Sequence, residues 1–334
     1  MTTHVLICDD SALARKQIAA TLPDDWDINI QFAEQGSDAL NLLRSQHIDV
    51  LFLDLNMPEL DGYGVLQAIQ QEAIRVLTLV VSGDIQPQAL QQVKELGALD
   101  FLKKPVNAQT LARQLSSYGL YRPGADTRRS APDTLPSPAP SLQSYLQEMA
   151  NVAMGQATDL LARLLNVFVE QPIPRVSRID RSELSMVISA AEGNNHYSAV
   201  CQGFVGAGVS GEALLLFSDA SIGEMARLLH YAPPDTAANE VEILMDMSSI
   251  LFGAFLNGLG EQLDIRLGLS QPSVLGQHQQ VTTLLEHHDR QSEQLLCIEI
   301  PYELEQLHLH CNLLVLLTED SVNRLEQRLI YLAE

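Results

Sequence analysis

The stretch VLFLDLNMP occupies residues 50–58 and joins four consecutive apolar residues to an aspartate, an asparagine and a proline. Strands that are apolar on both faces belong to parallel sheets that helices cover on both sides. Asp54 follows such a strand directly. In doubly wound folds, ligands bind where the carboxyl ends of the strands meet. The stretch therefore predicts a parallel α/β sheet with a functional carboxylate at its edge.

The sequence on both sides of this stretch continues the same alternation of strand and helix. Short apolar runs predict four further strands, at residues 4–8, 28–32, 76–81 and 99–102. Apolar residues at every third or fourth position predict the intervening helices, at residues 13–22, 37–44, 63–71, 87–96 and 108–118. Residues 1–121 are expected to form a doubly wound α/β domain with a five-strand parallel sheet.

Polar residues stand at the expected carboxyl ends of these strands. They are Asp9, Asp10, Asp54, Ser82 and Lys104. Three carboxylates that converge on one point repel one another unless a divalent cation lies among them, and a hard, oxygen-binding ion such as Mg²⁺ suits them. A carboxylate in such a site can attack a phosphoryl group, whose oxygens a hydroxyl and an ammonium group can bind. The pattern predicts a magnesium-dependent phosphoryl-transfer site.

These residues and their order resemble the CheY-like receiver family of two-component signalling. The resemblance covers residues 4 to about 120, and its motifs are Asp9-Asp10, Asp54-Leu55-Asn56-Met57-Pro58, Asp61-Gly62, Ser82-Gly83 and Lys104-Pro105. Each motif is common alone, whereas the complete set in this order is specific. The resemblance implies a response regulator that takes its phosphoryl group from a histidine kinase.

The resemblance also implies which residues take part in phosphorylation. Asp54 is expected to be the phosphoacceptor, with Ser82 and Lys104 binding oxygens of the phosphoryl group. Phe101 lies three residues before Lys104, at the aromatic switch position of the family. In that family the hydroxyl residue moves toward the phosphoryl group and the aromatic ring rotates inward behind it.

A magnesium site follows from the same resemblance. Asp10 is expected to bind the ion directly and Asp9 through a water molecule. Asp54 itself and the backbone carbonyl of Asn56 are expected to complete the protein ligands.

The charge of the chain points away from nucleic acid as a partner. The formal net charge is −22, and all four lysines lie before residue 105. A surface of this kind repels phosphate backbones.

The unbroken apolar runs are strand-length, no secretory signal is visible at the N-terminus, and the four cysteines are scattered. A cytoplasmic protein that binds neither nucleic acid nor membrane is therefore expected.

Beyond residue 121 the composition changes twice. Residues 122–141 are rich in Pro, Ser, Ala and Asp and predict a flexible linker. Residues 142–334 predict an α+β domain with two long helices, beginning near Leu142 and Glu240, and with an internal repeat. Its expected strands are at residues 184–190, 199–206, 213–217, 294–300 and 308–317.

The first long helix has two distinct faces. An apolar stripe, expected to be buried, consists of Leu142, Leu146, Met149, Ala153, Ala157, Leu160 and Leu164. A polar row, expected to face solvent, consists of Ser144, Glu148, Asn151 and Gly155. The row resembles the signature of the CheC, CheX and FliY phosphatases, which remove phosphate from receiver domains. By that resemblance Asn151 orients the attacking water, and Glu148 pairs with the active-site lysine of a receiver.

The second long helix repeats the polar row 98 residues later in an altered form. Asp246 and Ser249 stand in place of Glu148 and Asn151. Asp is one methylene shorter than Glu, and Ser cannot act as a carboxamide, so this second site is expected to be weak or silent. Two functions remain open: a response regulator that dephosphorylates the receiver of another protein or its own, and a non-catalytic module that sequesters a partner under control of the receiver.

Overall fold

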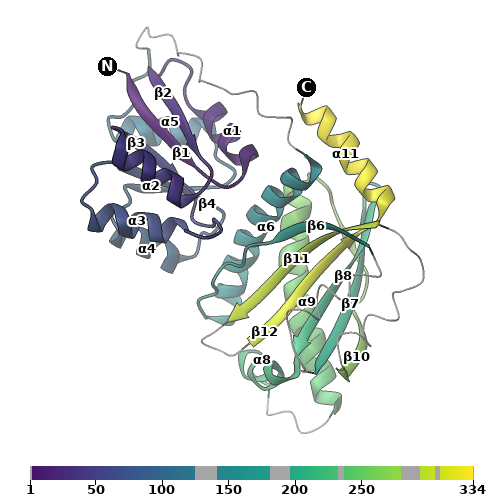
Figure 1. Ribbon diagram of the computed structural model, residues 1–334. Coiled ribbons are helices and arrows are strands. Elements are labelled where there is room, and N and C mark those ends of the chain that lie inside the picture. Colours follow the sequence, from purple (N-terminus) through teal and green to yellow (C-terminus); the bar gives the residue numbers. More distant parts are fainter. Residues whose placement is uncertain are drawn as a thin grey trace. The chain divides into compact units, whose positions relative to one another are not determined.

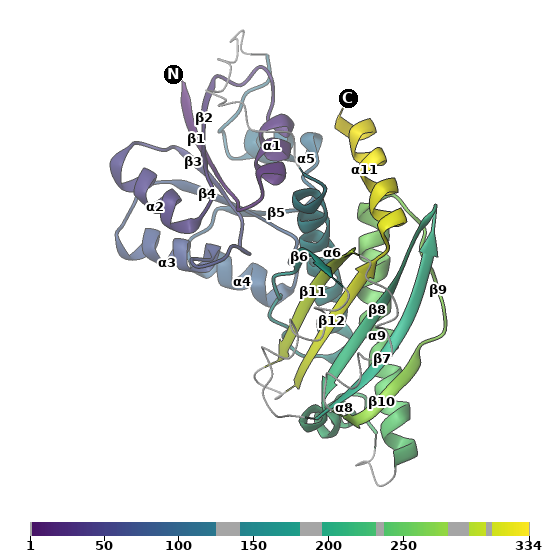
Figure 2. The same ribbon diagram turned by 45° about the vertical axis from the view of Figure 1, so that its right-hand side comes forward.

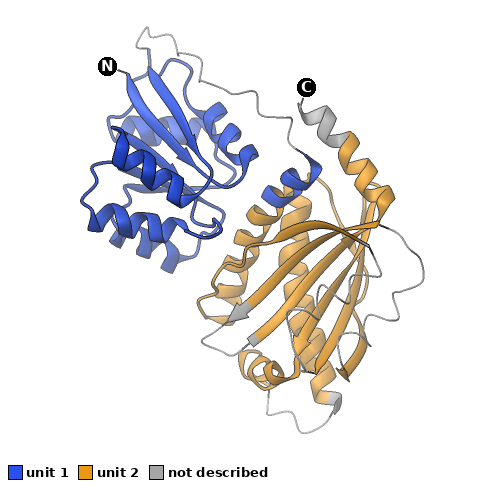
Figure 3. Ribbon diagram, in the orientation of Figure 1, with its two compact units in different colours: residues 1–148 blue, residues 149–334 orange. Residues whose placement is uncertain are grey.

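The computed structural model describes residues 2–124, 141–180, 196–231, 237–279, 294–304 and 309–333. Two compact units make up the chain, residues 1–148 and residues 149–334 (Figure 3). The first unit ends at Glu148, which lies inside helix α6 (Leu142–Leu165). Most of the expected linker, residues 125–140, and the expected strand at residues 184–190 lie outside the described residues.

The first unit contains a five-strand parallel sheet in the order β2-β1-β3-β4-β5 (Figure 1). Its strands are β1 (Thr3–Cys8), β2 (Ile28–Ala33), β3 (Val50–Leu53), β4 (Leu77–Ser82) and β5 (Asp100–Lys103). Its helices are α1 (Ala12–Thr21), α2 (Gly36–Ser45), α3 (Gly62–Gln71), α4 (Pro87–Glu95) and α5 (Ala108–Ser117). The five-strand parallel α/β prediction is confirmed, with element ends shifted by at most one residue.

Alternating side chains along the strands build a separate core on each face of this sheet. Leu6 and Leu51 pack with residues of α2, α3 and α4. Their neighbours Val5 and Val50 pack with α1 and α5, and Figure 2 shows the sheet between these two helical layers. Because successive side chains of a strand point to opposite faces, a strand covered on both sides must be apolar throughout.

The second unit contains a single mixed-length antiparallel sheet in the order β10-β7-β8-β12-β11-β6, with the short strand β9 paired to β7. Its strands are β6 (Arg175–Asp180), β7 (Tyr197–Gly206), β8 (Val209–Ser218), β9 (Gly268–Leu269), β10 (Ser273–Gln279), β11 (Gln294–Leu304) and β12 (Leu309–Leu317). The remaining elements are η2 (Asp219–Ser221), α8 (Ile222–Leu228), α9 (Ala237–Gln262) and α11 (Glu319–Ala333).

The elements of the second unit recur in the same order about 98 residues apart. The succession α6, β6, β7, β8, α8 is followed by α9, β10, β11, β12, α11. The hairpins β7–β8 and β11–β12 meet at the centre of the sheet, where β8 pairs with β12. Each repeat places its first strand beside the hairpin of the other, since β6 pairs with β11 and β10 with β7. The two halves therefore cannot close the sheet separately.

Helices α6 and α9 lie against each other on one side of this sheet (Figures 1 and 2). The contact is close at Gly258, where an added Cβ would lie 3.2 Å from the carbonyl oxygen of Ala153. Residues 239–262 are long and apolar enough to cross a membrane, but 67% of the most apolar window is buried in the protein. A buried core helix passes the same test, so this helix is weak evidence for a membrane span.

Sequence patterns misjudged several elements of the second unit. Leu160 and Leu164 belong to the predicted buried stripe, but they are 51% and 58% exposed, because the packed part of the stripe ends before the last turns of α6. The predicted strands did not include β6, β9 and β10. The two edge strands of the sheet, β6 and β10, carry polar residues on more than half of their positions, and a short edge strand needs little apolar surface.

Candidate functional site

Backbone hydrogen bonds align the carboxyl ends of the strands in the first unit. Asp54 N donates to Cys8 O at 2.9 Å, and Lys104 N donates to Ser82 O at 3.0 Å. Residues that directly follow neighbouring strands are thereby brought to one edge. Oxygen atoms of Asp9, Asp10 and Asp54 lie within 4.8 Å of one another there.

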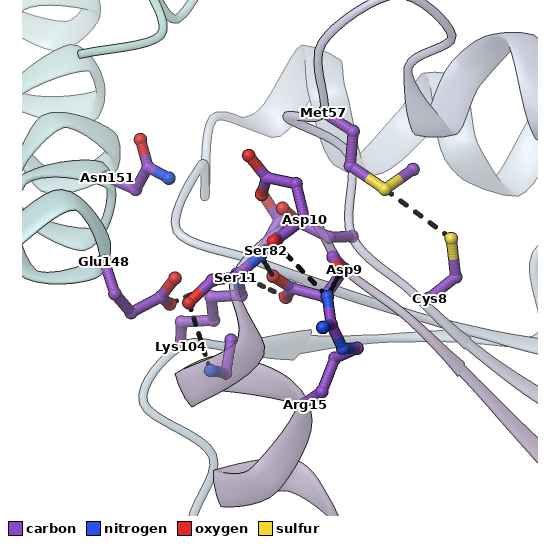
Figure 4. Close-up of polar contacts among 12 residues, drawn as sticks. Cys8, Asp9, Asp10, Ser11, Arg15, Met57, Ser82, Lys104, Glu148 and Asn151 are labelled. Atoms are coloured by element: carbon purple, nitrogen blue, oxygen red, sulfur yellow. Dashed lines mark hydrogen bonds and ion pairs between the residues drawn. The ribbon is translucent and has the colours of Figure 1, made fainter. Parts of the chain in front are cut away.

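Lys104 is the centre of an ion-pair network in the first unit (Figure 4). Its Nζ lies 2.8 Å from Asp9 Oδ2 and 3.4 Å from Asp54 Oδ1. Glu148, the last residue of that unit, places Oε1 3.3 Å from the same Nζ. All four residues are at most 5% exposed. A single buried ammonium group thus faces three carboxylates.

Burial and this network shift the pKa values of the acidic residues and of Lys104. Burial is the main cause that raises the pKa of Asp9, to about 7, although Lys104 counteracts it. Burial also raises the pKa of Asp54 well above its usual range. For Lys104, burial alone would lower the pKa, but the charges of Asp54, Asp9 and Glu148 outweigh it and raise the pKa. The site therefore holds its positive charge and resists full ionisation of its carboxylates.

We expect the stability of the metal-free protein to fall as the pH rises from about 4 to about 7. In this window the unfolded chain releases the proton of Asp9, whose ordinary pKa is 3.8, while the folded chain retains it up to about 7. Urea unfolding in the presence of EDTA should show a loss on the order of a few kcal/mol across the window. The Asp9→Asn variant should have a flatter profile; an unchanged slope would contradict the assignment.

The acidic cluster suits a divalent cation. Asp10 Oδ1 is buried and has no hydrogen-bond partner among the described residues. This oxygen belongs to one of the three clustered carboxylates of Asp9, Asp10 and Asp54, and carboxylate oxygens are the hard ligands that Mg²⁺ prefers. Asn56, whose backbone carbonyl is the fourth expected ligand, lies two residues after Asp54 in a loop and is half-buried.

The other residues expected in the receiver site lie as follows. Ser82 is fully buried, and its Oγ accepts a hydrogen bond from Asp84 N at 3.2 Å. Phe101 is half-buried and packs against the core that faces α2, α3 and α4. Gly62 approaches the site so closely that an added Cβ would collide with the backbone oxygen of Asp54. Position 62 therefore has no room for a side chain, which accounts for the glycine of the Asp61-Gly62 motif. Asp61 caps α3, since its carboxylate accepts a hydrogen bond from Gly64 N at 2.7 Å.

The polar row of α6 is largely buried, contrary to its predicted exposure to solvent. Ser144 is exposed, but Glu148 and Asn151 are only 1% and 5% exposed, and Gly155 is buried. Helical periodicity identifies residues on a common face, but it does not tell whether that face is open to water. For Glu148 the ion pair with Lys104 accounts for the burial. The side-chain amide of Asn151 is buried without a hydrogen-bond partner among the described residues.

The second polar row, on α9, is exposed to solvent, unlike the row on α6. Asp246 and Ser249 are both exposed. Asp246 Oδ2 accepts a hydrogen bond from Tyr231 Oη at 2.7 Å, and Ser249 Oγ donates to Met245 O at 2.8 Å in its own helix. The hydrogen bond from Tyr231 raises the pKa of that tyrosine to about 12. Both polar groups of this row are therefore engaged locally.

Sequence reasoning missed Arg15, which lies under the acidic site. Its side chain donates to the backbone carbonyls of Asp9 and Asp10 (Figure 4). It also donates to the carboxylate of Glu34. In sequence, Arg15 is simply a charged residue on a short helix. Its low exposure of 7% is the signal that singles it out, and only the folded structure provides it.

Comparison with protein families identifies the first unit. Residues 5–116 match the family described as the response regulator receiver domain. The chain is 37% identical over 112 residues to a probable transcriptional regulator, ycf27, of Guillardia theta, a match covering 33% of this chain and 43% of that protein. It is 33% identical over 181 residues to protein-glutamate methylesterase/protein-glutamine glutaminase 3 of Rhodospirillum rubrum, covering 47% of this chain and 48% of that protein. The chain thus spans less than half the length of these curated relatives.

Among solved structures, the chemotaxis protein CheY4 of Vibrio cholerae is similar to the same region. The sequence identity is 28%, the match covers 35% of this chain and 98% of that protein, and the TM-score is 0.33. A receiver domain implies a histidine kinase as its phosphodonor. From the family match, residues 5–116 are a response regulator receiver domain of a two-component system.

Proposed function

We propose that this chain is a response regulator phosphorylated on Asp54, and that residues 142–334 form a CheC-like output domain that hydrolyses the aspartyl-phosphate. The observation that carries the proposal is the ion pair between Glu148 and Lys104. In the resemblance to the CheC, CheX and FliY phosphatases, a glutamate at this position of the helix pairs with the active-site lysine of a receiver. Here both partners belong to one chain.

Phosphorylation begins with the carboxylate of Asp54, which attacks the phosphorus of a phosphohistidine on the kinase. The new O–P bond forms as the N–P bond to the histidine breaks, and the histidine nitrogen keeps the electron pair. Lys104 and Ser82 bind oxygens of the transferred group. Asp9, Asp10, Asp54 and the backbone carbonyl of Asn56 would hold Mg²⁺, which supplies charge neutralisation when bound.

Hydrolysis requires a water molecule held in line with the phosphorus. Asn151 follows Glu148 by one helical turn, so the two side chains leave α6 on the same side (Figure 4). By the resemblance to the CheC, CheX and FliY phosphatases, the carboxamide of Asn151 orients this water, because it offers both a donor and an acceptor. Attack by the water breaks the O–P bond, which regenerates the Asp54 carboxylate and releases inorganic phosphate and a proton.

The receiver of the same chain is the substrate that this pairing favours. Glu148 reaches a lysine of its own receiver, so no second molecule is needed for the contact. Dephosphorylation within one chain follows first-order kinetics, with a rate constant that does not depend on protein concentration. The opposite charge of the two side chains also selects a lysine-bearing receiver site over other surfaces.

The test compares the phosphate lifetime of the parent chain with that of the Glu148→Ala, Asn151→Ala double variant. We expect the double variant to lose phosphate at least about tenfold more slowly, because the water is no longer positioned. The matched control is Asp246→Ala with Ser249→Ala, which alters the equivalent positions of the second repeat. Equal lifetimes for the parent and the Glu148/Asn151 variant would dispose of the phosphatase.

A mixing experiment identifies the substrate. The phosphorylated double variant is combined with an Asp54→Asn chain whose α6 is intact. No acceleration is expected if the reaction occurs within one chain. Acceleration in proportion to the added chain would instead assign the output domain to the receiver of another molecule.

A non-catalytic output domain is the second candidate, and the second repeat favours it. The acid at Asp246 is held by Tyr231, and the hydroxyl of Ser249 bonds back to its own helix. Half of the duplicated row therefore lacks the groups for hydrolysis. Binding of a phosphorylated receiver without loss of phosphate would establish sequestration as the function.

A further inference from the structure

Arg15 joins three segments beside the acidic cluster. From α1, its Nη1 donates to the carbonyl oxygens of Asp9 and Asp10, at 2.7 Å and 3.3 Å. Its Nη2 donates to Glu34 Oε1 at 2.7 Å, just beyond the end of β2. The arginine side chain is 9% exposed, whereas that of Glu34 is 74% exposed. The guanidinium group is thus inserted under the turn that carries two of the clustered carboxylates.

The hydrogen bonds from Arg15 determine how this turn presents its side chains. Asp9 N donates to Ala33 O at 3.3 Å, and Asp9 Oδ1 accepts from Ser11 N at 2.9 Å. The carbonyl oxygen of Asp9 accepts from Arg15, so three groups of Asp9 (N, O and Oδ1) are held by hydrogen bonds. Its remaining oxygen, Oδ2, pairs with Lys104. The carbonyl of Asp10 is bound in the same way, while its buried Oδ1 keeps no described hydrogen-bond partner.

We propose that Arg15 is a positioning residue that sets the affinity of this cluster for a divalent cation, with Glu34 holding Arg15 in place. The inference rests on the magnesium site proposed above. Residues that orient metal ligands without touching the metal commonly contribute tenfold or more to metal affinity. Arg15 donates to backbone carbonyls rather than to the clustered carboxylates, so it orients these ligands without occupying their oxygens.

The positive charge of Arg15 has the opposite effect, which makes the proposal testable. A guanidinium group near the cluster repels a divalent cation. If charge dominated, neutralising Arg15 would strengthen metal binding. If orientation dominates, every substitution that breaks the forked hydrogen bonds weakens binding, whether or not the charge is kept.

The experiment titrates the full-length protein with Mg²⁺ alone and follows backbone amide shifts. Arg15→Lys keeps the charge and Arg15→Gln removes it; both are expected to raise the dissociation constant about tenfold. Glu34→Gln, a milder change that retains a neutral acceptor, is expected to raise it less. Arg113→Gln is the matched control, since Arg113 is an exposed arginine of α5.

A second measurement separates positioning from a loss of folding. The Mg²⁺ concentration for half-maximal phosphorylation by a small acyl phosphate should rise in Arg15→Lys, while the rate at saturating Mg²⁺ stays at the parent value. A lowered plateau with an unchanged midpoint would overturn the proposal, as would Mg²⁺ binding by Arg15→Gln that equals or exceeds that of the parent. Neither measurement depends on Glu148 or Asn151, so failure of the proposed phosphatase would leave this result intact.

Discussion

Replacing Asp54 with asparagine is expected to abolish incorporation of phosphate from a phosphorylated histidine kinase. The amide has nearly the shape of the carboxylate but is not a nucleophile of comparable strength. Asp54 is 3% exposed, and burial raises its pKa, so an ionised side chain is disfavoured in the folded protein. The neutral asparagine should therefore preserve or raise the stability of the metal-free chain at neutral pH, because the folded state no longer has to accommodate that charge.

The measurement is the stoichiometry of phosphate on the full chain after incubation with the phosphorylated kinase. Asp38→Asn, an exposed aspartate in the first turn of α2, is the control and should be phosphorylated like the parent. Urea unfolding of the Asp54→Asn variant shows whether its fold is intact. Stoichiometric labelling of that variant would place the phosphoacceptor elsewhere.

Replacing Lys104 with methionine is expected to destabilise the metal-free protein by about 3–5 kcal/mol. Methionine fills a similar volume but leaves the carboxylates of Asp9, Asp54 and Glu148 without their shared cation. Removing one partner from a buried ion pair is more costly than never having buried the pair. Protonation of a carboxyl group limits the loss, so the effect should be smaller in acid and larger above about pH 7, the pKa of Asp9.

Unfolding by urea in EDTA measures this loss, and the neighbouring Lys103 offers a control. Lys103 is exposed, so Lys103→Met should change stability little. Adding Glu148→Ala to Lys104→Met removes one of the unpaired carboxylates and should recover part of the loss. Additive effects of the two substitutions would show that Glu148 and Lys104 do not interact in solution.

The receiver domain could be predicted almost completely from its sequence. The continuous apolar run at residues 50–53 can be satisfied only in a sheet covered on both faces, and it is fully buried in the structure. In such a sheet the chain connectivity brings the residues after β1, β3 and β5 to one edge. Asp9, Asp54 and Lys104 therefore lie together for a topological reason that the order of residues already contains.

The second unit was predicted less well because its edge strands carry few apolar residues. The long helices were visible through their periodicity, and the strands of the two central hairpins through their apolar residues. The edge strands β6 and β10 pair on one side only and were not recognised. Exposure of Leu160 and Leu164 likewise depends on where packing against the helix ends, which no periodic pattern encodes.

The sequence alone determined the parallel sheet, the acidic edge with its lysine, and which side chains of α6 share a face. These properties follow from periodicity and connectivity, which act along the chain. Only the tertiary structure decided that Glu148 is buried against Lys104 and that Arg15 supports the Asp9-Asp10 turn. Both depend on hydrogen bonds and ion pairs whose strength comes from exclusion of water, and the burial that excludes water is a property of the assembled fold.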